Sequence, residues 1–119
     1  GSDWLLTRMD NSQSLADDVE VTLSFADGRI SGKSACNRYS AQVTEGDKPG
    51  EIIIGPTMGT RMACAEHLME TEFLFLKALG EVSSFSFHSE KLALNGTNKD
   101  GTPFSLLFIP TGIGPKIEL

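Results

Sequence analysis

The sequence predicts an α+β fold in which a predominantly antiparallel β-sheet or open barrel of about seven to eight strands packs on a single α-helix. Residues 60–80 carry apolar residues at three- and four-residue spacing, the period of a helix. Most of the remaining chain alternates apolar and polar residues in short runs, the period of a strand. The connections between these runs are too short for parallel crossovers, which indicates antiparallel pairing.

Five runs ahead of the helix have strand character. Asp27-Gly28 is expected to form the turn of the first hairpin, because this dipeptide tolerates the positive φ angles of tight turns. Residues 56–62 are expected to be an extended or looping lead-in to the helix. The strand runs are residues 4–9, 19–25, 29–34, 39–45 and 51–54, with a polar loop at 10–18.

The single helix is predicted to begin near Ala65 and to end before Gly80 as a left-handed cap. Its apolar stripe is expected to face the sheet, and Glu72 is expected on the opposite, exposed face. Phe73 and Leu76 would then be core residues. The full stripe is Leu68, Met69, Phe73, Leu76 and Leu79.

Three further strands are expected after the helix, at residues 82–88, 91–95 and 102–109. Asn95-Gly96 and Asp100-Gly101 bracket the last connection, which indicates a hairpin there. Residues 110–119 are expected to form an irregular tail. The chain is therefore interpreted as one domain over residues 3–119, with residues 1–2 as the remnant of a cleaved tag.

The formal net charge of −6 opposes a phosphate backbone and an anionic lipid surface. No nucleic-acid partner is therefore expected. No apolar run is long enough to span a bilayer, although a signal peptide or lipid-anchor segment could have preceded Asp3. A monomer is expected.

Cys36 and Cys64 could form one disulfide in an oxidising compartment, or remain buried thiols in a reducing one. Their number does not decide between these states. Both flank loops that lead into or face the start of the helix, so we expect them to lie close together. They could then form a disulfide if the compartment is oxidising.

Four polar residues near the same loops form the candidate site: Asn37, Arg38, Tyr39 and Arg61. Two guanidinium groups and an aromatic ring on an acidic chain could bind a carboxylate or a polar peptide edge. In the alternative and favoured interpretation, Asn37 and Arg61 hydrogen-bond loop carbonyls and Tyr39 packs on the barrel.

Neither a metal site nor a catalytic residue is expected. Cys36, Cys64, His67 and His88 could in principle supply four zinc ligands, but the sequence contains only one pair at suitable spacing. A Cys64–His67 nucleophile would need an orienting group and an oxyanion hole, and the sequence identifies neither. No glycine-rich phosphate loop is present, and no cofactor is expected.

Two motifs, SACNRYSA (Ser34 to Ala41) and TMGTRMAC (Thr57 to Cys64), resemble those of the META domain, also called the HslJ-like heat-shock family. The resemblance extends over nearly the whole chain, including the DGRISG hairpin and the LALNG…GTPFSLLF ending. There are two departures: Ala35 replaces the glycine or similar small residue that is common before the first cysteine, and Ala41 stands where glycine is frequent in the family.

The resemblance implies a bacterial envelope or stress-associated domain, often a lipoprotein or secreted, with no established catalytic activity. We therefore expect a noncatalytic protein in the periplasm, on a lipid anchor or outside the cell, acting on an envelope protein partner or in envelope maintenance. The alternative is a carrier of a small apolar ligand held between helix and sheet. A thiol-dependent enzyme is a third, weaker possibility.

Overall fold

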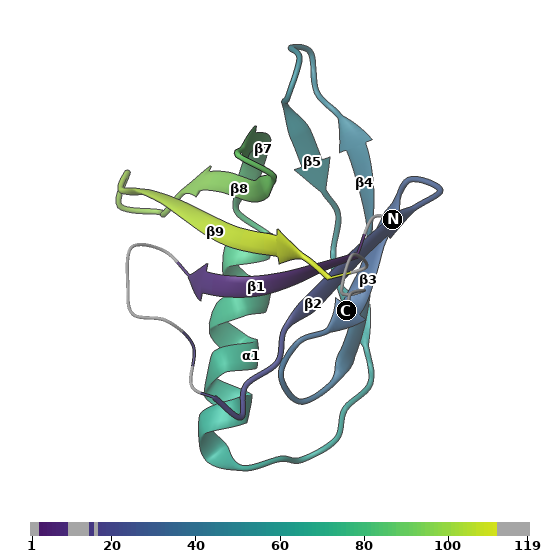
Figure 1. Cartoon of the computed structure of the whole chain (residues 1–119), viewed down its shortest axis with the longest axis vertical. Coiled ribbons are helices and arrows are strands. Elements are labelled where there is room, and N and C mark those ends of the chain that lie inside the picture. The colour runs from purple at the N-terminus through teal and green to yellow at the C-terminus, as the bar shows by residue number, and fades with distance from the viewer. Residues whose placement is uncertain (1–2, 10–14, 16, 112–119) are drawn as a thin grey trace.

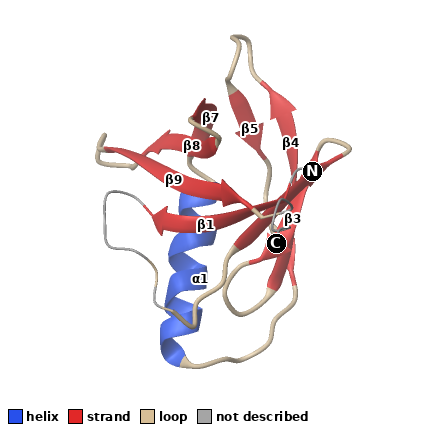
Figure 2. Cartoon of the chain, viewed as in Figure 1, coloured by secondary structure: helices blue, strands red, loops and turns tan. Residues whose placement is uncertain are grey.

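The computed structural model describes residues 3–9, 15 and 17–111, and within them it contains one helix and nine strands (Figure 2). The elements are β1 (Asp3–Met9), β2 (Thr22–Ala26), β3 (Arg29–Lys33), β4 (Arg38–Glu45), β5 (Ile52–Ile54), β6 (Met58–Gly59), α1 (Glu66–Leu79), β7 (Val82–His88), β8 (Lys91–Thr97) and β9 (Pro103–Pro110).

The strands form one antiparallel sheet that nearly closes into a barrel. Eight strands are hydrogen-bonded in the order β5-β4-β3-β2-β1-β9-β8-β7. The two ends of this order meet where Glu51 forms an isolated bridge with Ser84 and the Phe85 N–H donates to the Gly50 carbonyl at 2.9 Å. The two-residue strand β6 adds to β4. The α+β fold expected from the sequence is therefore confirmed.

The two expected hairpins are both present. Asp27 and Gly28 have φ angles of 55° and 75°, as the turn between β2 and β3 requires. The turn between β8 and β9 lies further along the chain than expected, because β8 continues through Asn95 and Gly96 to Thr97. Gly101, with φ 89°, completes that turn.

Helix α1 packs its inner face against the barrel (Figure 1). Phe75 and Leu79 are fully buried, and the Phe75 ring meets the Tyr39 ring edge-on with centroids 5.4 Å apart. Val21, just ahead of β2, and Leu106 and Phe108 of β9 are among the most deeply buried residues of the core. Residues from both halves of the sheet therefore share one apolar core with the helix.

The predicted helix stripe is wrong in part. Phe73 is 66% exposed, and Met69 is also exposed, whereas Phe75 was not expected in the core and is fully buried. Leu76 is only partly buried. The inward residues are Leu68, Glu72, Phe75 and Leu79, a helical row at steps of four, three and four residues. An acidic residue occupies one position of this row, so a search for apolar residues alone selects the neighbouring face.

The expected left-handed cap at Gly80 is also wrong, because Gly80 has a right-handed φ of −69°. Its N–H instead continues the helical hydrogen-bond pattern to Leu76 at 3.2 Å. Most of the expected loop at 10–18 and of the expected tail at 110–119 lies outside the described residues, and Pro110 is the last residue of β9 rather than part of a tail. Within the described part of the chain, no helix is long and apolar enough to cross a membrane.

Candidate functional site

A disulfide joins Cys36, in the loop between β3 and β4, to Cys64, just ahead of α1. The sulfur atoms are 2.04 Å apart and the Cα atoms 5.9 Å apart. The two motif loops named above are thereby linked across 28 residues of sequence. Neither sulfur is available as a thiolate nucleophile or zinc ligand in this state.

The loop that carries Cys36 holds a backbone conformation that favours glycine. Ala35 is buried and has φ 85°, in the left-handed region that residues with a side chain rarely adopt. This is one of the two positions at which the sequence departs from the family pattern. The Ala35 N–H donates to the Glu20 carbonyl at 3.1 Å, which ties the strained loop to the residue ahead of Val21.

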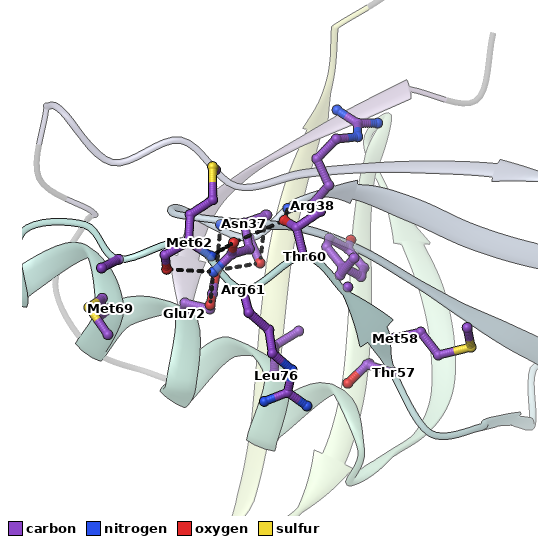
Figure 3. Close-up of a pocket in the computed structure, with 14 residues that line it drawn as sticks. Asn37, Arg38, Thr57, Met58, Thr60, Arg61, Met62, Met69, Glu72 and Leu76 are labelled. Atoms are coloured by element: carbon purple, nitrogen blue, oxygen red, sulfur yellow. Dashed lines mark hydrogen bonds between the residues drawn. The ribbon is translucent and has the colours of Figure 1, made fainter.

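Asn37 follows Cys36 and is buried, with 6% of its surface exposed. Its Oδ1 accepts hydrogen bonds from the Thr60 hydroxyl (2.9 Å) and the Met62 N–H (2.6 Å), and its Nδ2 donates to the Met62 carbonyl (3.3 Å) (Figure 3). The Asn37 amide thus pairs with the Met62 backbone as a neighbouring strand would. This fixes the extended segment that leads into the helix.

Glu72 reaches this cluster from α1. Its Oε1 accepts from the Asn37 N–H at 2.7 Å and lies 2.8 Å from the Ser34 hydroxyl, and its Oε2 accepts from Asn37 Nδ2 at 2.9 Å. Both carboxylate oxygens are therefore occupied by groups from one loop. The expectation that Glu72 lies on the exposed face is wrong.

The hydrogen bonds of Glu72 determine its charge state. Partial burial raises the pKa of the carboxyl group, but hydrogen bonds from the Asn37 side chain and backbone, the Ser34 hydroxyl and the Cys36 N–H together lower it further than burial raises it. The net pKa of Glu72 lies below its usual value, so the group is ionised at neutral pH. The only sequence signal for this residue is its place in the row formed by Leu68, Phe75 and Leu79.

Tyr39 belongs to the core, since only 4% of its surface is exposed. Its hydroxyl donates to the Thr22 carbonyl at 2.8 Å. Burial raises the pKa of the phenol, so Tyr39 remains a neutral donor. Its ring therefore packs within the barrel, as the structural interpretation of the motif expects.

Arg38 and Arg61 are both exposed, and their side chains extend in opposite directions (Figure 3). The Arg61 side chain runs past Leu76 of the helix, whereas Arg38 points away from it. Neither guanidinium has a hydrogen-bond or ion-pair partner among the described residues. Arg61 therefore does not bond a loop carbonyl, and the structure does not bring the two guanidinium groups together.

These residues line an open groove of about 480 Å³ between the segment 57–63 and α1. Met69, Glu72 and Leu76 line it from the helix (Figure 3), and Ser34, Asn37 and Tyr39 are also among the lining residues. The groove is thus lined by apolar side chains, by two arginines, Arg38 and Arg61, whose guanidinium groups have no bonded partner among the described residues, and by one carboxylate that is already bonded.

The two histidines lie elsewhere. His67 Nε2 is 2.6 Å from an Asp18 carboxylate oxygen, and His88 Nε2 is 2.9 Å from the Ser86 hydroxyl. In the part of the chain that the structure describes, no three His, Cys, Asp or Glu residues are grouped so that they could hold a metal ion. The four zinc-ligand candidates are therefore not brought together.

Comparison with known proteins gives a family and a fold. Residues 1–107 match the META domain. The NMR structure of a protein from Burkholderia xenovorans is similar, with a TM-score of 0.67 and 23% sequence identity over 92% of this chain and 81% of that chain. No curated protein gives a significant match. The match spans both cysteine motifs, the helix and nearly all of the sheet, and the chain therefore belongs to the META domain family.

Proposed function

We propose that the chain is a noncatalytic, stress-associated domain of the bacterial cell envelope that acts as a monomer by binding another protein. Membership of the META family supports a stress-associated bacterial role. The observation that carries the proposal is the groove beside α1, whose rim exposes apolar side chains and an unpaired Arg61. The Ser34 hydroxyl lies 2.8 Å from the Glu72 carboxylate, but Ser34 is fully buried and its hydroxyl is also 2.9 Å from the Asn37 carbonyl, which favours a structural role for this pair.

The disulfide supports an envelope location. Disulfides form and persist in the periplasm and outside the cell, whereas the cytosol keeps most thiols reduced. Cys36 and Cys64 are bonded in the structure. A periplasmic, lipid-anchored or secreted protein accommodates this bond.

The groove has the composition of a protein-binding surface. Met58 and Met62 on one side are 67% and 58% exposed, and Met69 faces them from the helix. Methionine adapts its shape to different partners, and both methionine and arginine are enriched at protein interfaces. Three exposed methionines and Arg61 along one groove therefore favour a protein partner.

The proposal can be tested by photo-crosslinking in cells of the native bacterium. A photoreactive residue at Met62 samples the groove, and the same residue at Leu74 samples an exposed position on another part of the helix. We expect a discrete protein adduct in the envelope fraction from position 62 that position 74 does not give. The same products from both positions, or none from position 62, would contradict the proposal.

A second candidate function is the transport of a small apolar ligand. It is favoured by a hollow of about 210 Å³ where α1 meets the sheet, lined in part by Leu74, Ala78, Phe104 and Leu106. Native mass spectrometry of protein purified without detergent tests it. A bound apolar molecule that Ala78→Phe removes would support the carrier. Unliganded protein in both preparations would reject it.

A further inference from the structure

We propose that the partner enters the groove as an extended segment, which adds a strand to the free edge of β6 and places an acidic residue beside Arg61. This inference rests on the proposed function, because it describes how a protein partner is held. It predicts the class of sequence that binds: an extended peptide that combines apolar and acidic residues.

Within the described part of the chain, the segment 58–62 makes backbone hydrogen bonds on one side only, toward β4 and Asn37. Met58 pairs with Ser40 of β4, the Thr60 N–H donates to the Arg38 carbonyl at 3.1 Å, and the Met62 N–H donates to Asn37 Oδ1 at 2.6 Å. Every second residue therefore turns its backbone groups toward β4 and Asn37.

The residues between them must turn their backbone groups the other way, since successive residues of an extended chain present N–H and C=O to opposite edges. Gly59 and Arg61 thus face away from β4. The Arg61 backbone has no hydrogen-bond partner among the described residues, and both residues line the groove. Free strand edges of this kind pair readily with an added chain.

Gly59 is required for this geometry. A Cβ at this position would clash with the Arg38 carbonyl oxygen, so glycine allows β6 to lie close against β4. The disulfide and the Asn37 amide then hold the rest of the segment. The edge is consequently pre-formed, which lowers the entropy cost of binding a strand to it.

The helix provides the opposite wall of the groove. Met69 and Leu76 face the segment from α1, and the Arg61 side chain extends past Leu76 (Figure 3). A segment between a strand edge and a helix can bond its backbone on one side and pack its side chains on the other. The apolar part of the predicted partner follows from these two residues.

The acidic part follows from the charges. Arg61 is unpaired on a chain of net charge −6, and the acid that lines the groove, Glu72, has both oxygens bonded by Asn37 and Ser34. Glu72 forms no ion pair with Arg61 in the structure. A carboxylate from the partner can therefore pair with the guanidinium, whereas a partner lysine would be repelled by it.

The direct test is an NMR titration of the full chain with two capped synthetic peptides, one alternating valine and glutamate and one alternating valine and lysine. We expect the glutamate peptide to shift the amide signals of Gly59 and Arg61 and to slow their hydrogen exchange. The lysine peptide should bind about tenfold more weakly or worse. Equal binding of both peptides would overturn the charge assignment.

Matched variants sharpen the test. Arg61→Glu should weaken binding of the glutamate peptide by about tenfold or more, whereas Lys91→Glu, the same charge change at an exposed position outside the groove, should stay within about twofold. Equal losses in the two variants would show a nonspecific charge effect and overturn the site.

N-methylation of the peptide tests the added strand itself. Two peptides are compared, one methylated on its odd-numbered backbone nitrogens and one on its even-numbered ones. One of them should lose binding and the other should keep it, because only alternate residues of the peptide face β6. Equal loss of binding by both methylated peptides, or unchanged amide signals of Gly59 and Arg61 on titration, would overturn strand addition. If strand addition fails but a partner is still crosslinked at Met62, the proposed function stands. If the peptide binds but no partner is crosslinked in cells, the proposed function is rejected and strand addition to β6 stands.

Discussion

The two faces of α1 differ in a way that their hydrophobicity does not predict. Phe75 is fully buried, while Phe73, two residues earlier, is 66% exposed. Glu72, the residue before Phe73, turns inward and bonds Asn37 and Ser34. The inner face is therefore apolar toward the C-terminal half of the helix and polar where it meets the cystine-linked loop. The orientation of the helix thus satisfies Glu72 at the motif loop as well as Phe75 and Leu79 in the core, and apolar content alone does not predict it.

A carboxylate that is partly withdrawn from water is stabilised where hydrogen bonds replace those it made with water. Asn37 and Ser34 supply these bonds, and Asn37 also holds Met62. The same small cluster therefore positions the helix and the groove segment. Its removal should affect both.

The largest difference between the two faces should appear on truncation of the phenylalanines. Phe75→Ala should lower the free energy of unfolding by about 3–5 kcal/mol, because it leaves a cavity in the core. Phe73→Ala should change it by about 0.5 kcal/mol or less, since the side chain is mostly exposed. Urea denaturation of both variants measures this. Comparable losses would mean that the helix is rotated from the orientation described.

The disulfide tests the contribution of the loop that meets the polar half of the helix. Reduction of Cys36–Cys64 should lower the free energy of unfolding by about 3.5 kcal/mol in the chain-entropy model for a separation of 28 residues. Thermal melts with and without reductant, with Cys36→Ser/Cys64→Ser as the control for added reductant, measure it. An unchanged melting temperature on reduction would show that the disulfide does not stabilise the fold.

The Glu72 carboxylate should contribute less than either of these. Glu72→Gln introduces an amide donor opposite Asn37 Nδ2 and the Ser34 hydroxyl, and should cost about 1–3 kcal/mol. Glu70→Gln, two residues away and exposed, is the matched control and should be nearly silent. Equal stability of the two variants would show that the inward carboxylate adds nothing.

The sequence was sufficient to predict most strands, because their apolar alternation and turn residues are local. Asp27-Gly28 marks its hairpin in this way. The motif residues Cys36 and Cys64 also indicated that two distant loops could meet. Local sequence patterns therefore predict the strands, the turns and the approach of the two cysteine loops.

What the sequence did not reveal depends on partners far apart in the chain. Glu72 looks solvent-exposed until the Asn37 loop is placed against it. Strand β6 has no alternating pattern, and its pairing depends on contact with β4. The direction of Arg61 likewise follows from the extended segment that Asn37 holds. Residue type and spacing do not determine such contacts.

The stability of wild type and of Glu72→Gln should depend differently on pH in the acidic range. The pKa of Glu72 is lower in the folded chain than its usual value, so its stabilising contribution is present above about pH 4.3 and is lost as the pH falls through the folded pKa. Wild type should therefore lose more stability than Glu72→Gln on acidification through this range. Parallel pH profiles of the two proteins would contradict the assignment.

The most direct test of the central claim, that Glu72 and the Asn37 amide dock the groove segment onto the helix, is a double-mutant cycle. Glu72→Ala, Asn37→Ala and the double variant are compared with wild type by urea denaturation. Because the two side chains share a hydrogen bond of 2.9 Å, we predict a coupling energy of about 1–2 kcal/mol. Effects that add to within about 0.3 kcal/mol would show that the two residues act independently and would contradict the account.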